Sequence, residues 1–154
     1  LTIAGSFTAD NKVYDGNTTA TIASNSLTLT GLISGDTVSI NTATAAANFA
    51  DRNVGTAKVV ALSNASLTGA NAANYSITLA GAPTATANIT PKELTIAGSF
   101  TADNKVYDGN TTATIASNSL TLTGLISGDT VSINTATAAA NFADRNVGTA
   151  KVVA

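Results

Sequence analysis

The chain contains no cysteine, histidine, methionine or tryptophan. Without cysteine there is no disulfide, no thiol catalysis and no cysteine-ligated zinc. Without histidine as well, a hydrolytic site would have to use lysine or paired carboxylates, and the few aspartates stand singly at predicted turns. We therefore expect that the protein is not an enzyme and that it holds no cofactor.

Charge is equally scarce. Only 10% of the residues are charged, and seven basic and nine acidic residues give a net charge of -2. These residues are scattered, so no basic stripe is available to neutralise phosphate groups, and nucleic acid is not an expected partner. The apolar runs are short and interrupted by Thr, Asn or Gly, which predicts no transmembrane helix and no membrane insertion.

The composition that remains is typical of a β-rich extracellular module. Hydrophobic residues make up 44% of the 154 residues, which is enough for a core, and the polar surface has to be built from Thr, Ser and Asn. No signal peptide is present and the chain begins at Leu1. We therefore expect a part of a longer protein whose targeting segments lie elsewhere.

An internal repeat dominates the sequence. Leu1 to Ala61 and Leu94 to Ala154 are identical at all 61 positions, so the period is 94 − 1 = 93 residues. A unit of this length can own a hydrophobic core, unlike the shorter units of solenoids. We predict domains in tandem, with a complete repeat over residues 1–93 and a truncated second repeat over residues 94–154.

Two further points concern the boundary of the repeat. Pro91, Lys92 and Glu93 form the expected inter-repeat joint, because proline fixes φ and removes a backbone donor. The phase of the folding unit stays open, since residues 62–154 also make up one full period.

Short runs with alternating apolar and polar residues predict strands. They cover residues 1–7, 27–32, 37–41, 58–63, 75–80 and 84–90. The segment 42–50, "TATAAANFA", is ambiguous because its alanines favour helix, and we predict a strand there as well. The predicted core consists of Leu1, Ile3, Phe7, Val13, Leu27, Leu29, Val38, Ile40, Phe49, Val59, Leu62, Tyr75, Ile77, Leu79 and Ile89.

Five blocks in order, "ADNKVYDGNTTAT", "LISGDTVSI", "ANFADRNVGTAKVV", "LTGANAANYSITL" and "ANITPKELTI", resemble the YDG-type repeat domain. That family occurs in large bacterial surface and secreted adhesins, including filamentous-haemagglutinin-like exoproteins. The resemblance implies an all-β fold, a small β-sandwich or β-grasp-like domain repeated in tandem. It implies no catalytic residues.

The repeated stretch "NKVYDGNTTAT" predicts a turn. Asp followed by Gly between two β-like runs is typical of a hairpin, since Gly adopts positive φ and Asp accepts a bond from the turn backbone. The structural-turn residues are Tyr14, Asp15 and Gly16, and in the second copy Tyr107, Asp108 and Gly109. We expect the ring of Tyr14 to lie in the core rather than on the surface as a carbohydrate platform.

Two alternatives to a purely structural motif were weighed. The weak calcium candidates are Asp10, Asp15, Asp36 and Asp51, although no dense acidic loop is present and single aspartates are ordinary at turns. A Lys–Asn isopeptide crosslink would need a lysine, an asparagine and a carboxylate together, and nothing in the sequence selects such a set.

We expect a structural stalk or fibre repeat of a bacterial surface adhesin, which projects or spaces a distal tip. Its expected location is extracellular or on the bacterial cell surface, and its expected partners are neighbouring repeats of the same chain. One alternative is a weak glycan-binding or surface-binding module that acts by avidity. Another is a self-assembling fibre subunit that uses β-strand complementation.

Overall fold

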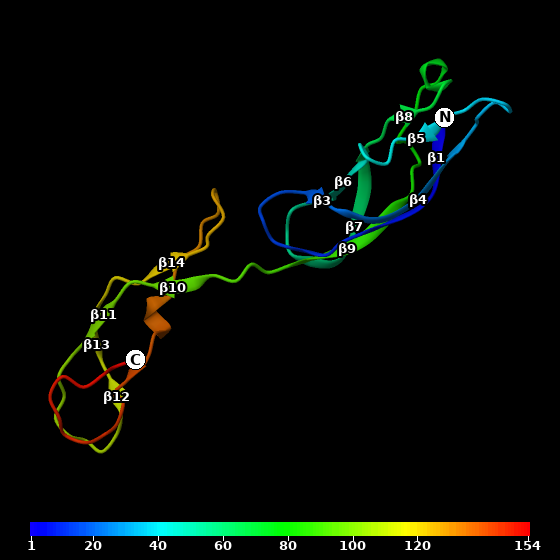
Figure 1. Ribbon diagram of the computed structural model, residues 1–154. Coiled ribbons are helices and arrows are strands. Elements are labelled where there is room, and N and C mark those ends of the chain that lie inside the picture. Colours follow the sequence, from blue (N-terminus) through cyan, green and yellow to red (C-terminus); the bar gives the residue numbers. More distant parts are fainter. The chain divides into compact units, whose positions relative to one another are not determined.

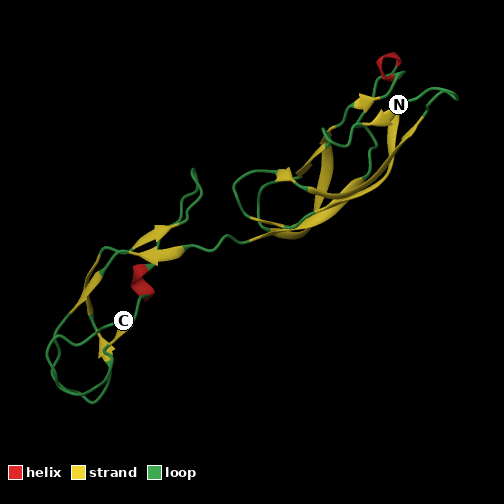
Figure 2. Ribbon diagram, viewed as in Figure 1, coloured by secondary structure: helices red, strands yellow, loops and turns green.

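The computed structural model describes residues 1–154 and divides them into Leu1–Lys92 and Glu93–Ala154, here called unit 1 and unit 2 (Figure 1). Strands account for nearly all of the regular structure, and only two short 3-10 segments, η1 (Ala72–Asn74) and η2 (Thr135–Thr137), interrupt them (Figure 2). The all-β prediction is confirmed.

Unit 1 begins with a long antiparallel hairpin. Strand β1 (Thr2–Ala9) pairs with β4 (Ile22–Thr30) along its whole length, with one register shift between Thr8 and Ala9. Gly5 has φ +85°, and a Cβ there would lie 2.2 Å from the carbonyl oxygen of Ser26. The close approach of the two strands therefore requires glycine at this position.

A five-stranded sheet forms the rest of the scaffold, in the order β2-β9-β7-β6-β3. Its strands are β2 (Lys12–Val13), β9 (Thr84–Thr90), β7 (Gly55–Asn64), β6 (Ala46–Phe49) and β3 (Thr19–Ala20). Only the β2–β9 pair is parallel. A separate pair joins β5 (Ser39–Ile40) to β8 (Leu67–Thr68).

The core of unit 1 lies between this sheet and the hairpin. Its buried members are Ile3, Phe7, Ala20, Ile40, Ala47, Phe49, Val60, Leu62, Ala87 and Ile89, with Tyr14, Leu27, Leu29 and Ile77 among the partly buried residues packed against them. Six predicted core residues are thus buried. Strand β9 is central, because Ile89 is only 1% exposed and the strand pairs on both of its edges.

Three predicted core residues, Val13, Val59 and Leu79, are exposed. In β7 the register shifts between Gly55 and Lys58, where Ala57 has φ +48°. Beyond this bulge Val60 faces the core, so Val59 faces outward, since side chains alternate along a strand.

Two strand predictions also need correction. Residues 75–80 form no strand, and only an isolated parallel bridge joins Thr78 to Thr2. A turn in which the Ala82 amide donates to the Leu79 carbonyl oxygen ends this segment. The predicted strand over 42–50 is confirmed only in part, because β6 covers Ala46–Phe49 and residues 42–44 form a turn.

Unit 2 has fewer and shorter strand pairs. Strand β10 (Thr95–Ala97) pairs with β14 (Thr121–Thr123), β11 (Phe100–Ala102) with β13 (Ile115–Asn118), and β12 (Thr112–Ala113) with β15 (Ala140–Asn141). Its fully buried hydrophobic residues are Ala113 and Ala140.

Candidate functional site

The repeated motif folds around one lysine. In unit 1 the Lys12 ammonium lies 2.7 Å from Asp15 Oδ1, 3.0 Å from Asn17 Oδ1, and 2.9 and 3.1 Å from the carbonyl oxygens of Asn17 and Thr19. It also lies 5.7 Å from the centre of the Phe49 ring, within cation–π range. We call residues 12–19 of unit 1, and 105–112 of unit 2, the lysine-centred turn.

Local chemistry explains why these residue types are needed. The Asp15 carboxylate accepts the Asn17 amide at 3.1 Å, and the Asn17 side chain accepts the Thr19 amide at 2.9 Å, which gives two successive Asx turns. Gly16 sits between them at φ +81°, a conformation that glycine adopts without strain. The Lys12 hydrogen bond also lowers the pKa of the Asp15 carboxyl below its ordinary value.

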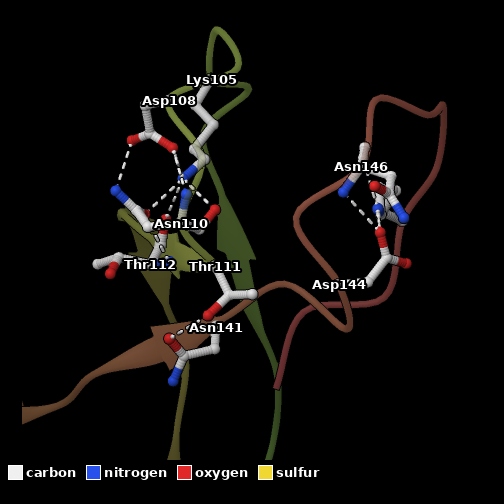
Figure 3. A network of polar contacts seen from close by, with 9 residues as sticks. Lys105, Asp108, Asn110, Thr111, Thr112, Asn141, Asp144 and Asn146 are labelled. Carbon is white, nitrogen blue, oxygen red and sulfur yellow. Dashed lines mark hydrogen bonds and ion pairs between the residues drawn. The ribbon is translucent and has the colours of Figure 1, made fainter.

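The same turn forms in unit 2 (Figure 3). Lys105 lies 2.7 Å from Asp108 Oδ1 and 2.8 Å from Asn110 Oδ1, and its ammonium donates to the Thr112 carbonyl oxygen at 3.1 Å. Gly109 has φ +82°. All of these contacts lie within eight residues, so the motif encodes its own conformation.

The turn is not a hairpin, so that prediction was wrong. Strand β2 before it and β3 after it do not pair with each other and instead form the two opposite edges of the five-stranded sheet. Lys12 lies on β2 and binds the carbonyl oxygen of Thr19 on β3. The turn therefore ties one edge of the sheet to the other.

A second lysine turn accompanies the first in both units. Lys58 lies 2.6 Å from Asp51 Oδ1, which also accepts the Asn53 amide at 2.8 Å. In unit 2 Lys151 pairs with Asp144, and the Asn146 amide donates to the same oxygen at 2.7 Å. Lysine hydrogen bonds lower the pKa values of both aspartates.

The four aspartates weighed as calcium ligands do not come together. No group of three or more acidic side chains that could hold a metal ion forms anywhere in the chain. Asp15 is paired with Lys12, Asp51 with Lys58, and Asp36 accepts the Tyr75 hydroxyl at 2.5 Å. Asp10 is exposed, and its backbone amide donates to the Thr21 carbonyl oxygen.

Lysine, asparagine and a carboxylate do meet, in the lysine-centred turn. An isopeptide bond would require a neutral Lys12 amine to attack the Asn17 side chain. The ammonium is instead surrounded by four oxygen acceptors, one of them the carboxylate of Asp15, and this favours its charged form. The arrangement is suited to an ion pair rather than to amide formation.

One polar cluster was not predicted from the sequence. The Tyr75 hydroxyl donates to Asp36 and accepts the Ile33 amide at 3.2 Å, while Asn71 Oδ1 accepts the Thr37 amide at 2.9 Å. The bond to Asp36 raises the pKa of Tyr75. These partners lie 34 to 42 residues apart, so no local pattern marks them.

The remaining predicted residues are placed as follows. Tyr14 packs against the core of unit 1, whereas Tyr107 is 58% exposed in unit 2. Pro91, Lys92 and Glu93 are exposed and lie between β9, which ends at Thr90, and β10, which begins at Thr95. No helix of the chain is both long enough and apolar enough to cross a membrane.

An all-β unit that is tied together by a lysine-centred turn and written twice places the chain among tandem β-repeat proteins. The family model of the YDG domain matches residues 1–86 and residues 90–154, and the chain belongs to this family. The comparisons with curated proteins and with solved structures gave no match.

Proposed function

We propose that the chain is a structural spacer, a stalk or fibre repeat of a bacterial surface adhesin that projects a distal adhesive tip. The observation that carries this proposal is the use of the motif's polar groups. In both units Lys, Asp and Asn of the "NKVYDGNTTAT" motif bind one another and the turn backbone.

Such groups serve the fold of each repeat, so a repeated motif adds length rather than binding sites. A globular unit of this size has a radius of gyration of roughly 12 Å, so one repeat would add about 30 to 40 Å. The proposal includes an extracellular or cell-surface location, with neighbouring repeats of the same chain as the partners.

The proposal is tested with a series of adhesins that differ only in the number of YDG repeats. The distance between labels placed at the two ends should rise by one constant increment per repeat. Adhesion that is lost on removal of one repeat should return when an unrelated rigid domain of equal length replaces it. Failure of the unrelated spacer to restore adhesion would show that the repeat itself binds.

A further inference from the structure

Unit 2 contains a cavity of about 1150 Å³ beside its lysine-centred turn. Apolar side chains in its lining include Ile96, Phe100, Tyr107, Phe142 and Val153. Ile96 is 64% exposed, although the identical residue of unit 1, Ile3, is 3% exposed. An apolar surface that is buried in one copy of a sequence is therefore open in the other.

In unit 1 strand β9 occupies the equivalent place. The Asn88 amide donates to Asn11 Oδ1 at 2.7 Å, and Asn88 Oδ1 accepts the Ala57 amide at 2.8 Å. The Tyr14 amide donates to the Thr90 carbonyl oxygen at 2.9 Å. Ala87 and Ile89 of the same strand are buried among the core residues.

Unit 2 keeps the receiving groups in place for such a strand. Asn104, Tyr107 and Ala150 all line the cavity, and they correspond to Asn11, Tyr14 and Ala57 of unit 1. Ala150 has φ +51°, close to the φ of +48° at Ala57, so the bulge that meets the Asn88 side chain is already formed. A site that is preformed in this way spends less free energy on ordering when it binds.

We propose that this cavity is a strand-acceptor site, and that its ligand is the final third of a YDG repeat, residues 62–92 of this sequence, carried on a separate chain. The complementarity is the one that unit 1 displays, residue by residue. The proposal goes beyond the spacer function and does not rest on it.

The chain's own β9 cannot fill this site by moving forward. In the bound arrangement of unit 1, parallel pairs join Thr78 to Thr2 and Thr90 to Val13, so the residue matching Thr90 lies beyond the far end of β1. Seven residue steps along β1 span roughly 23 Å. The four steps from Thr90 to Leu94 span at most about 14 Å.

Exchange between copies of this chain does not fill the site either. Two copies hold 2 × 1 strands of the β9 type and 2 × 2 places for them, because unit 1 of each copy already uses its own strand. Swapping leaves the number of filled places unchanged. The chain alone is therefore expected to be monomeric, and a free donor segment is the occupant.

The test is a titration of the isotope-labelled 154-residue chain with a synthetic peptide of residues 62–92, followed by amide resonances and hydrogen exchange. We expect saturable one-to-one binding, new protection of the Tyr107 and Ala150 amides, and unchanged resonances in unit 1. A control peptide with Ile89→Asp should bind at least about tenfold more weakly, because its carboxylate would enter an apolar site.

Two variants of the chain locate the binding. Ile96→Asp should abolish binding, and Asn104→Ala, which removes one exposed hydrogen-bond acceptor, should weaken it roughly fivefold. The proposal is overturned by the absence of saturable binding, by binding that survives Ile96→Asp, or by a peptide that displaces β9 from unit 1. A dimer of the chain alone that Ile96→Asp dissolves would overturn the choice of occupant.

Discussion

Residues 1–61 and 94–154 have the same sequence but different surroundings. In unit 1 the repeat is followed by residues 62–92, which supply the end of β7 and all of β9. The described chain provides no second copy of that segment for unit 2. The comparison therefore separates what the first 61 residues of a repeat encode by themselves from what the last third adds.

The polar turns belong to the first class. The lysine-centred turn, the Asp51–Lys58 turn and the positive φ of Ala57 all have counterparts in unit 2, at Lys105, at Asp144 with Lys151, and at Ala150. Each depends on partners only a few residues away.

The hydrophobic core belongs to the second class. Ile3 is buried only in the unit that contains β9, and its counterpart Ile96 is exposed. Short-range hydrogen bonds thus shape the turns of a repeat, while burial of apolar surface depends on contacts made across most of its length.

The largest expected difference comes from Ile3→Asp and Ile96→Asp. Ile3→Asp buries an unpaired charge and should lower the free energy of unfolding of unit 1 by at least about 4 kcal/mol. Ile96→Asp changes an exposed residue and should alter the stability of unit 2 by less than about 0.5 kcal/mol. Urea denaturation followed by resolved resonances of each unit measures both effects, and equal losses in the two units would refute the distinction.

Tyr75→Phe should give a smaller effect that is confined to unit 1. It removes the hydroxyl that joins Asp36 to the Ile33 amide, which we expect to cost about 1 kcal/mol. The same denaturation experiment checks it. Tyr107→Phe is the matched control, and a comparable loss of stability from this control would argue against a specific role of the Tyr75 contact.

Ala57→Gly and Ala150→Gly test a feature that the two units share. Both alanines have positive φ, which costs an L-residue roughly 1 to 2 kcal/mol, and glycine returns part of this gain as chain entropy. Each substitution should therefore stabilise its own unit, by up to about 1 kcal/mol. A gain in one unit only would mean that the bulge depends on β9 after all.

The smallest effect concerns acid. The pKa values of Asp15 and Asp108 lie below the ordinary 3.8 because each carboxylate binds the lysine of its turn. A lowered pKa in the folded state stabilises the fold above the unfolded-state pKa, and this contribution disappears as the pH falls through the folded-state pKa. Carboxyl resonances titrated by NMR should show the same direction of shift in both units, and Asp15→Asn should leave the acid response of unit 2 unchanged.

The sequence was sufficient to predict the all-β class, the repeat and most of the strands, because alternation and turn residues are local properties. It misplaced Val59, since the bulge at Ala57 reverses the alternation and an alanine with positive φ leaves no mark in the pattern. It also predicted a hairpin at Asp15 and Gly16, where the flanking strands lie at opposite sheet edges. Pairing over long distances, as between Asn11 and Asn88, cannot be inferred from local periodicity.

The central claim is that residues 62–92 convert the first 61 residues of a repeat into a unit with a buried core. The most direct measurement compares amide hydrogen exchange at matched positions, such as Phe49 with Phe142 and Val60 with Val153, before and after a second copy of residues 62–92 is appended behind Ala154. We predict that protection in residues 94–154 rises to the level of residues 1–61. Protection that stays lower in residues 94–154 after the addition would contradict the account.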